Sequence, residues 1–396
     1  MTLPPFATAV PSVNDIWGED WADVLALWAL EPSVDHLNHG SFGAVPLAVL
    51  EEQQSWRTRM EENPVRFFSR ELVVALEEAR GDVSRFLGVE DDGLVFVRNA
   101  TTGVSTVLAS LDLEAGSEIL VTDHSYGAVL LAVGRHARRA GVTVVTAEVP
   151  LEADDDELVA RVLAAAGERT RLAVLDDITS PTARRLPLER IVPALKERGV
   201  QVLVDAAHGP GMLDIAVPAV GADYWTGNLH KWCCAPRGSG ALWVAPELRG
   251  DMRPLVASWD EEAPYPVNFQ RSGTDDYTAW LAVPRALRTL SHLGWDRVRA
   301  HNAELAGQAQ RRLAEALGIE RPVTRPDVSM QLVPLPTGVA ANLADAGALQ
   351  ISIAERVGVE VAITSCRGQG FVRVSAAAYN APKDYDRLCE HLPGLL

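Results

Sequence analysis

The sequence predicts an α/β protein with a mostly parallel central sheet flanked by helices, followed by a smaller C-terminal α+β domain. Between residues 94 and 244, short apolar runs alternate with helical patterns, which is typical of a parallel sheet covered on both faces. Several of these runs are rich in Val, Ile and Leu and end in polar turns, as buried parallel strands do. Beyond about residue 250 the alternation stops and longer helical patterns begin. Together these observations predict the fold class.

Length and composition indicate a globular protein that acts on small molecules. The 396 residues, 47% of them hydrophobic and 22% charged, are enough for two domains that share an extensive core. A net charge of −17 would repel phosphate backbones, so nucleic acid is not expected as a partner. No segment offers the ~20 apolar residues of a membrane span, and four cysteines make no disulfide framework at this length. We therefore expect a cytoplasmic protein without membrane contact.

Three regions are expected along the chain. Residues 1–45 form an N-terminal arm that packs on the small domain, residues 46–255 form the large domain, and residues 256–396 form the small domain. The arm carries tryptophans at helical spacing, and packing in a core or an interface is the simplest interpretation of Trp17, Trp21 and Trp28.

The predicted strands of the large domain lie at residues 94–97, 117–122, 142–149, 171–175, 200–205, 222–225 and 241–244. Helices are expected at 47–60, 104–111, 156–166 and 188–198, and another after residue 127. Only the last strand follows its predecessor without a helix, so we expect it to be antiparallel and at or near an edge of the sheet. In the small domain we expect helices at 278–293, 296–317 and 346–356, and strands at 328–334, 359–363 and 371–375.

An acid and a lysine lie at the ends of two consecutive strands. Asp205 ends one apolar run, and Lys231 lies just beyond the polar turn that follows the next. Open α/β sheets bind their ligands at these carboxyl ends, so both side chains can face one cavity. For an isolated pair, a turn-capping aspartate and a solvated lysine would be the commoner explanation, and the surrounding motifs have to decide.

Two motifs around this pair resemble those of fold-type I pyridoxal 5′-phosphate (PLP) enzymes, and among them the class-V aminotransferase family, the group that includes isopenicillin N epimerase. They are Asp205-Ala206-Ala207-His208 and Gly227-Asn228-Leu229-His230-Lys231-Trp232. The resemblance implies the PLP-transferase type I fold and PLP as the cofactor. It also implies that Lys231 forms the Schiff base and that Asp205 keeps the pyridine nitrogen protonated. His208 would then bond the phenolic oxygen or the substrate carboxylate, and a satisfied core histidine is the alternative.

The turn after the first strand can bind an anion. It leads into a helix whose free N–H groups and positive dipole end suit a phosphate, and Thr101 and Thr102 add hydroxyls. A threonine N-cap is the plain alternative. In the family the PLP phosphate binds at this turn, which implies that Thr101 and Thr102 contact it. Asn228 and His230, beside the lysine, are expected to help hold it.

A further motif implies a homodimer. Gln270-Arg271-Ser272-Gly273-Thr274 resembles a family segment whose Gly-Thr pair reaches the phosphate in the neighbouring subunit. Thr274 occupies the position of that threonine. The resemblance therefore implies a homodimer with shared active sites.

An aromatic side chain beyond strand 117–122 is expected to lie on the pyridine ring. The strand ends in Asp123-His124-Ser125-Tyr126-Gly127, and offset stacking adds roughly 1 kcal/mol to burial. His124 is our first choice for this position and Tyr126 is the second.

Three further segments are expected to bind the substrate. The loop Leu37-Asn38-His39-Gly40-Ser41-Phe42-Gly43 resembles a family segment near the substrate, which implies carboxylate contacts from Asn38 and Ser41. Arg373 lies in an Arg-Val-Ser signature whose arginine grips the α-carboxylate in the family, since a guanidinium can donate two N–H groups to it. An exposed, solubilising arginine is the alternative. Asp177 stands where relatives often carry a histidine, so the epimerase reaction does not carry over directly.

The expected catalytic set is Lys231, Asp205, His208 and His124, with Lys231 as the base for the Cα proton of an amino acid. No metal site is expected. Lyases, epimerases, desulfurases and aminotransferases of this fold share that first step. We expect β-elimination from a cysteine-type, S-substituted substrate, because it needs only a leaving group on Cβ.

The alternatives differ in what else they need. Epimerisation, the second expectation, needs another acid or base, for which Asp177 or a loop tyrosine is available. A desulfurase needs a mobile cysteine, and Cys366 lies in a loop that looks too short. Transamination and a non-catalytic PLP-binding homologue are further alternatives. An unrelated nucleotide-binding protein is disfavoured because the glycine-rich phosphate motifs are missing.

Overall fold

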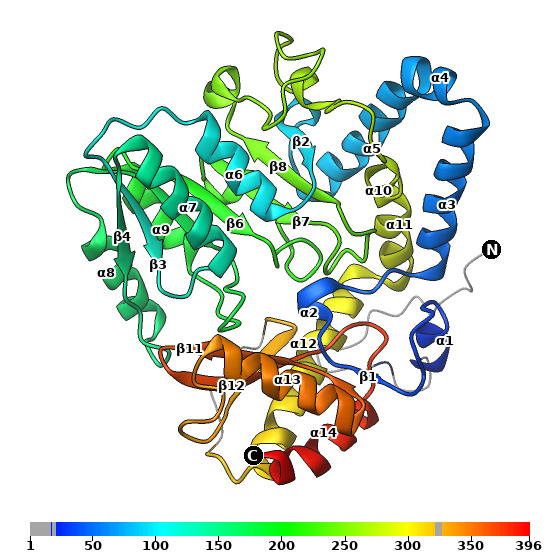
Figure 1. Cartoon of the computed structure of the whole chain (residues 1–396), viewed down its shortest axis with the longest axis vertical. Coiled ribbons are helices and arrows are strands. Elements are labelled where there is room, and N and C mark those ends of the chain that lie inside the picture. Colours follow the sequence, from blue (N-terminus) through cyan, green and yellow to red (C-terminus); the bar gives the residue numbers. More distant parts are fainter. Residues whose placement is uncertain (1–16, 18–20, 321–326) are drawn as a thin grey trace.

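The computed structural model describes Trp17, residues 21–320 and residues 327–396. A large α/β unit contains the main sheet, and a smaller unit is built on a second sheet, with the first described segments of the chain lying beside the smaller unit (Figure 1). Of the predicted N-terminal arm, residues 1–16 and 18–20 lie outside the described residues. No helix in the described ranges is both long and apolar enough to cross a bilayer.

The main sheet has the order β2-β8-β7-β6-β5-β3-β4. Its strands are β2 (Leu94–Val97), β3 (Glu118–Thr122), β4 (Thr143–Ala147), β5 (Thr170–Asp176), β6 (Gln201–Ala206), β7 (Tyr224–Asn228) and β8 (Gly240–Val244). The pairs β4-β3-β5-β6-β7 are parallel, whereas β8 is antiparallel to both β7 and β2. The prediction of a mostly parallel sheet is confirmed, and β8 lies one strand in from the edge.

Helices cover both faces of this sheet, and each face has its own apolar core. On one face lie α6 (Ala100–Ser110) and α7 (Gly127–Ala140). The other face is covered by α5 (Leu72–Leu87), α8 (Asp155–Ala165), α9 (Leu188–Lys196), α10 (Thr278–Leu281) and α11 (Val283–Leu293), with α3 (Leu47–Glu62) packed outside them. Strand residues alternate between the faces: Leu203 contributes to the first core, and Val202 and Val204 contribute to the second. This two-sided burial explains why the strands are apolar throughout.

Two predicted helices differ from the observed ones, and one observed helix was not predicted. Helix α6 begins at Ala100, before the predicted start at 104, because the Asn99 side chain caps it by accepting the Thr102 N–H. The predicted helix 278–293 is divided at Ala282, since Pro284 in the first turn of α11 has no N–H to continue the ladder. Helix α5 was not predicted. It follows α4 (Pro64–Arg66) and a π-helical turn at Phe67–Glu71.

The smaller unit is an antiparallel sheet backed by helices. Its strand order is β11-β12-β9, with β9 at Met330–Pro334, β11 at Ala362–Cys366 and β12 at Gln369–Ser375. Helices α12 (Trp295–Ala316), α13 (Leu343–Val357) and α14 (Asp386–His391) build its core with these strands. The C-terminal sheet domain was expected, but the predicted strand 359–363 is two strands, because β10 (Val359–Glu360) pairs in parallel with β1 (Asp35–His36).

Tryptophans tie the beginning of the chain to its end. The Trp17 indole donates to the carbonyl of Ala378 (2.6 Å), and the Trp21 indole, at the start of α1 (Trp21–Leu25), donates to the carbonyl of Tyr379 (2.8 Å). Trp28 packs edge-on against the Tyr379 ring. These contacts anchor the segment that continues through β1 into the short helix α2 (His39–Phe42).

Two helical glycines should respond to alanine in opposite ways. A Cβ at Gly103 of α6 would lie 2.7 Å from Cβ of Thr226, which is fully buried, so Gly103→Ala should lower the free energy of unfolding by about 1–3 kcal/mol. At Gly134 of α7 a Cβ would meet only the end of Arg138, at 3.5 Å. Gly134→Ala should therefore raise the free energy of unfolding by about 0.5–1 kcal/mol. Denaturant unfolding measures both changes. Equal effects would contradict the close packing of α6 on β7.

Candidate active site

The predicted lysine and acid lie at one edge of the sheet, at the carboxyl ends of neighbouring strands. Asp205 is the penultimate residue of β6, and Lys231 follows β7. Nζ of Lys231 lies 3.1 Å from Nε2 of His208, three residues beyond Asp205. Asp205 and His208 are almost fully buried, whereas Lys231 keeps partial contact with solvent. The sheet therefore brings the three side chains into one site.

The tautomer of His208 determines how it meets Lys231. The Trp232 indole N–H donates to Nδ1 of His208 at 3.3 Å, so a neutral ring carries its proton on Nε2. That N–H points to Nζ of Lys231, which then accepts through the lone pair of an uncharged amine. The pKa of His208 is well below its usual value because of burial and the nearby cationic Lys231 and Arg373, which agrees with a neutral ring.

Burial also favours the uncharged form of the lysine. It lowers the pKa of Lys231 to about 7, with the Arg373 charge acting in the same direction and the carboxylates of Asp205 and Asp176 opposing it. Burial raises the pKa of Asp205 to about 6, although the Ala207 N–H, which donates to its carboxylate at 3.0 Å, and Lys231 both favour the ionised form. The site thus holds a nucleophilic amine near neutral pH.

Asp176 is a site residue that sequence reasoning missed. It ends β5 directly beside Asp205 in the strand register, and its side chain is 4% exposed. Burial and the neighbouring Asp205 charge raise its pKa well above the usual value, against hydrogen bonds from the Ser125 side chain and the Tyr126 backbone. The signal in the sequence was its place at the end of an apolar run next to Asp205's strand.

His39 was also missed as a site residue, although the loop that contains it was singled out. Its Nε2–H donates to the carbonyl oxygen of Lys231 (3.0 Å), so Nδ1 accepts from the Tyr379 hydroxyl (3.0 Å). Burial lowers the pKa of His39 to about 4, so the ring is neutral. Gly43 of the same loop has φ +68°, and a Cβ there would lie 3.1 Å from Cα of Lys231. The loop therefore packs directly on the lysine.

The start of α6 is tied to the strand that precedes Lys231. The Ala100 N–H donates to the side-chain oxygen of Asn228 (2.9 Å), and the Thr102 N–H and hydroxyl both donate to Asn99. His230 donates from Nδ1 to the carbonyl of Ser239 (2.9 Å). The structure thus places the predicted phosphate residues Asn228 and Thr102 at one helix start, with Asn228 serving as a tie to the helix.

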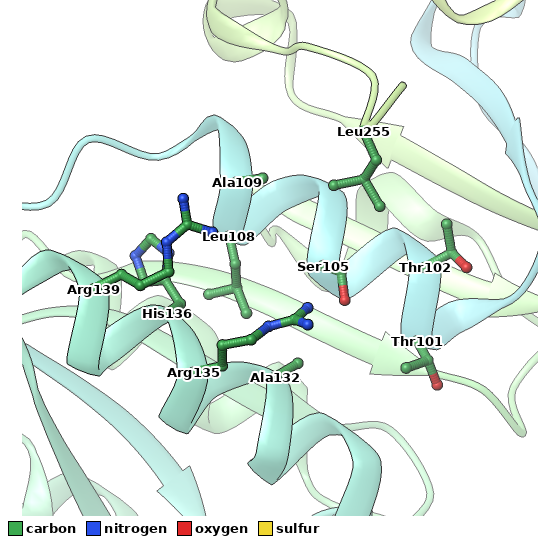
Figure 2. Close-up of a pocket in the computed structure, with 10 residues that line it drawn as sticks. All are labelled: Thr101, Thr102, Ser105, Leu108, Ala109, Ala132, Arg135, His136, Arg139 and Leu255. Atoms are coloured by element: carbon green, nitrogen blue, oxygen red, sulfur yellow. The ribbon is translucent and has the colours of Figure 1, made fainter. Parts of the chain in front are cut away.

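Thr101 and Thr102 also line a groove between α6 and α7 (Figure 2). Small side chains of both helices form its floor, and the basic side chains of α7 line it on one side. Leu255, from the loop after β8, borders the groove and is about half exposed (48%). The groove thus extends the helix start toward the exposed loop after β8.

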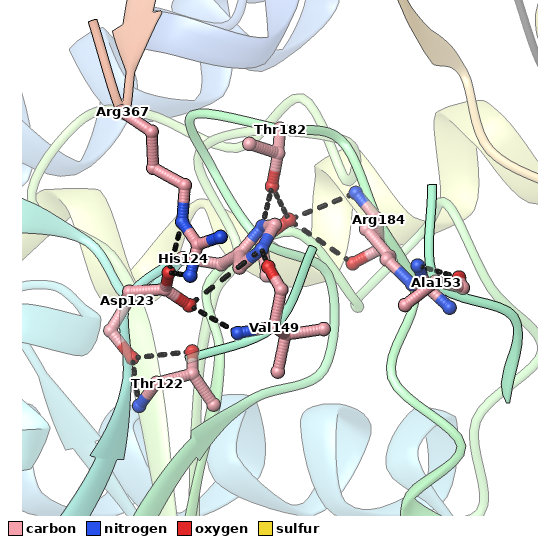
Figure 3. Close-up of polar contacts among 10 residues, drawn as sticks. Thr122, Asp123, His124, Val149, Ala153, Thr182, Arg184 and Arg367 are labelled. Carbon is pink, nitrogen blue, oxygen red and sulfur yellow. Dashed lines mark hydrogen bonds and ion pairs between the residues drawn. The ribbon is translucent and has the colours of Figure 1, made fainter. Parts of the chain in front are cut away.

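The two aromatic candidates beyond β3 differ in exposure and in their hydrogen bonds. His124 is 2% exposed, and both of its ring nitrogens are bonded within the protein, to Thr182 and Val149 (Figure 3). Tyr126 is 44% exposed, interacts electrostatically with Arg373, and donates its backbone N–H to the carboxylate of Asp176. Tyr126 therefore borders the site through Arg373 and Asp176, and which of the two rings stacks on the cofactor stays a prediction.

Arg373 is buried at the seam between the two units. Its Nη1 donates to the carbonyl and hydroxyl of Ser180, and its Nη2 donates to the hydroxyl of Ser41 (3.0 Å) and lies 3.5 Å from the side-chain oxygen of Asn38. Its Nε is buried without a partner, and no carboxylate among the described residues forms an ion pair with it. Burial lowers its pKa to about 10. The guanidinium is therefore not the exposed, solubilising arginine of the alternative.

Two predicted residues lie apart from the lysine. Asp177 is buried against Gly209, where a Cβ would lie 2.7 Å from Oδ2, and burial raises its pKa to about 6 despite the nearby Arg185 charge. Thr274 is exposed, on a loop held by the ion pair of Asp275 with Arg98. No contact joins either side chain to Lys231 among the described residues.

Cys366 is held in a short hairpin. It ends β11 and pairs with Gln369, so that Arg367 and Gly368 alone form the turn, with Arg367 at φ +51°. The Arg367 Nε donates to the carboxylate of Asp123 (2.6 Å) on the large unit. Burial raises the pKa of the Cys366 thiol. The cysteine is therefore neither mobile nor activated.

Comparisons with known proteins match most of the chain. Residues 43–388 match the family model for aminotransferase class-V. Isopenicillin N epimerase from Streptomyces clavuligerus is 32% identical, over 95% of this chain and 98% of that protein. A probable chloroplastic L-cysteine desulfhydrase from Arabidopsis thaliana is 31% identical, over 92% of this chain and 84% of that protein.

One solved structure with a similar fold is the cystine C–S lyase C-DES in complex with its reaction product, cysteine persulfide. Its TM-score is 0.78 at 22% sequence identity, and the match covers 91% of this chain and 98% of that one. This similarity concerns the fold, and it confirms the predicted PLP-transferase type I class.

Lys231 should react as an amine of unusually low basicity. The chain has only three lysines, Lys196, Lys231 and Lys383, so each can be followed separately by mass spectrometry. In the apoprotein, reductive methylation of Lys231 by formaldehyde should reach half its maximal rate near pH 7, because the uncharged amine is the reactive form above its pKa of about 7. Lys196 and Lys383 are the internal references. A Lys231 profile that coincides with theirs would refute the uncharged amine.

Proposed function

Because the chain belongs to the class-V aminotransferase family and uses pyridoxal 5′-phosphate, we propose that it removes the Cα proton of an α-amino acid and expels a sulfur leaving group from Cβ. The proposed substrate is a cysteine-type amino acid, in particular an S-substituted cysteine. The observation that carries the proposal is a buried arginine without an acidic partner among the described residues, in the same site as a lysine whose pKa burial lowers to about 7.

PLP fits the residues present. Lys231 supplies the amine for its aldehyde, and Asp205, on the neighbouring strand, supplies the carboxylate for its ring nitrogen. Thr101, Thr102 and the first N–H groups of α6 would hold the phosphate, with His230 nearby. When bound, the cofactor supplies a conjugated ring that accepts the electron pair of Cα. Tyr126 would cover one face of that ring.

Arg373 would bind the α-carboxylate of the substrate. Two of its nitrogens are already directed by Ser180, Asn38 and Ser41, and these neighbours are neutral, so its charge is left for an incoming anion. The buried Nε without a partner marks the remaining donor. A carboxylate held by this fork orients the bond from Cα to its hydrogen, and orientation of this kind can supply several kcal/mol of the barrier.

Lys231 would take the Cα proton. Its pKa of about 7 leaves a substantial uncharged fraction at neutral pH, and the His208 N–H directed at Nζ holds the amine in place. The proton then resides on Nζ, close to the carboxylates of Asp205 and Asp176, which favour the charged amine. The same ammonium group can return a proton to the leaving group or to Cα.

Elimination is favoured over sulfur transfer to the enzyme. Transfer would require a thiolate that reaches the substrate sulfur, and Cys366 is buried in a two-residue hairpin joined to Asp123. Cys233 and Cys234 are buried as well, and burial raises the pKa of both thiols. The sulfur group would therefore leave as a free thiol or sulfide.

Epimerisation is the second candidate. The specific ground is that the sequence identity of this chain to isopenicillin N epimerase is similar to its identity to the desulfhydrase. It would need a second proton donor opposite Lys231. Tyr126, which is about half exposed at the site, is the candidate for this donor through its hydroxyl. Asp177 is less suited because it faces Gly209 and Arg185. Transamination is retained as a further alternative.

The reaction is tested with S-substituted cysteines. Purified enzyme should release pyruvate, ammonia and thiol in equal amounts, and Lys231→Ala should lower this rate by at least about 10³-fold and remove the visible absorption of the bound cofactor. Cys366→Ala is the matched control and should retain full activity. Inverted product with solvent deuterium at Cα and no pyruvate would reject elimination in favour of epimerisation.

We propose further that the protein is a homodimer whose subunits share their active sites. Trp259 is 96% exposed, and Leu255 and Val256 are exposed on the same loop, which is an apolar surface that a partner would cover. Leu255 also borders the groove at Thr101 and Thr102, so this surface adjoins the proposed phosphate site. Thr274, exposed on its own chain, would then reach the partner's phosphate.

The dimer is tested by a charge at its proposed centre. Trp259→Glu should shift the mass in light scattering from two chains to one, and it should speed PLP release, because the partner's phosphate contact is lost. Leu343→Glu changes another exposed leucine, 81% exposed on α13, and should leave the mass unchanged. A wild-type protein that is monomeric with PLP bound would reject the proposal.

A cytoplasmic location remains a prediction. It is supported by the four cysteines, all of which are free, because a chain without disulfides has no need of an oxidising compartment.

A further inference from the structure

His124 has a complete set of hydrogen bonds that the proposed chemistry does not use. The ring lies directly after β3, with Nε2 2.7 Å from the Val149 carbonyl and Nδ1 2.7 Å from the Thr182 hydroxyl (Figure 3). Burial lowers its pKa, so the ring is neutral. A neutral ring whose two nitrogens are both occupied is held in one orientation.

The direction of these bonds follows from their partners. A carbonyl can only accept, so Nε2 of His124 donates to Val149 and Nδ1 accepts from the Thr182 hydroxyl. The Thr182 oxygen then accepts from the Thr179 hydroxyl (2.6 Å), whose oxygen accepts the Arg184 N–H (2.9 Å). The Thr179 oxygen also lies 3.3 Å from the Arg184 carbonyl, so a second contact ties the same two residues together.

This chain of bonds holds residues 178–185, which we call the bracing segment. Its ends are joined by a bridge between Ile178 and Arg185, and the Arg184 side chain anchors it to the carbonyl of Ala153 and to Asp155. At its centre Ser180 accepts hydrogen bonds from Arg373 through both its carbonyl and its hydroxyl. The bracing segment therefore sets where the guanidinium of Arg373 lies.

We propose that His124 is a positioning residue that, through Thr182, fixes the bracing segment so that Ser180 presents Arg373 to the substrate carboxylate. The inference rests on the proposed role of Arg373 in carboxylate binding. The expectation that the His124 ring stacks on the cofactor stays a separate prediction, because both hydrogen bonds lie in the plane of the ring. His124 then acts on substrate recognition from the large unit, although Arg373 belongs to the smaller one.

Removing one link of the chain tests the proposal. Thr182→Val keeps the shape of the side chain but takes the donor away from His124, and Thr182→Ser keeps the donor. Thr182→Val should raise KM for an S-substituted cysteine about tenfold, the size expected for one lost hydrogen bond, and leave KM for its methyl ester unchanged. Thr182→Ser should have the wild-type KM for the S-substituted cysteine. His124→Phe should reproduce the effect, and the Thr182 pair suffices if that variant does not fold.

Controls separate positioning from loss of structure. Thr289→Val removes another buried hydroxyl, bonded to the Arg285 carbonyl of α11, and should change neither KM. PLP affinity, measured by absorbance, should be equal in all Thr182 variants. In an Arg373→Gln background, Thr182→Val should have no further effect on the acid KM.

The outcomes distinguish the two proposals. If Arg373→Gln alone leaves the preference for acid over ester intact, the carboxylate role of Arg373 is wrong and the positioning role falls with it. If Arg373→Gln abolishes that preference while Thr182→Val preserves it, only the positioning role is overturned. If Thr182→Val raises KM equally for the acid and the ester, the chain of bonds contributes only to packing, and the positioning role is overturned as well.

Discussion

The contact between the Lys231 amine and the neutral ring of His208 is the interaction on which the rest of the site depends. An ammonium group at this position would face an N–H donor without an acceptor, so the contact is satisfied only when the amine is uncharged. Trp232, by donating to the far nitrogen of the ring, selects the tautomer that makes this so. Trp232, the residue next to the lysine, thus acts together with burial and the Arg373 charge in favouring the uncharged amine, through a histidine that follows another strand.

Lys231 and the two buried acids beside it, Asp205 and Asp176, influence one another's charge. Asp205 and Asp176 are adjacent in the register of two parallel strands, and two buried carboxylates so close cannot both be ionised easily. Lys231 provides the positive charge that stabilises one of them, and they favour the charged amine once it has taken a proton. Amine and acids form one titrating group, which suits a residue that must gain and lose a proton in each cycle.

The sequence was sufficient for features carried by local patterns and failed for those made by tertiary contacts. Asp205, Lys231 and Arg373 could be identified because strand ends and family motifs mark them. Asp176 was missed, although it ends an apolar run, because its place beside Asp205 comes from the pairing of β5 with β6. The difference between His124 and Tyr126 likewise depends on Thr182, 58 residues from His124 in the sequence, which binds one nitrogen of the histidine ring, whereas Tyr126 is left partly exposed. The start of helix α6 was predicted too late because Asn99 was not recognised as its N-cap.

The pairing of β1 with β10 has a consequence for the way the two halves of the site are assembled. Leu37 continues this pairing and accepts the Ser375 N–H, so Asn38 and Ser41 are built on the same scaffold as Arg373. Lys231 and Asp205 belong to the other scaffold. A change in the packing of the two scaffolds would alter the distance between Arg373 and the Lys231 amine, and it would also strain the contacts of His39 and Gly43 with Lys231. The length of substrate that fits is thereby set by the packing of the two scaffolds as well as by the side chains that touch the ligand.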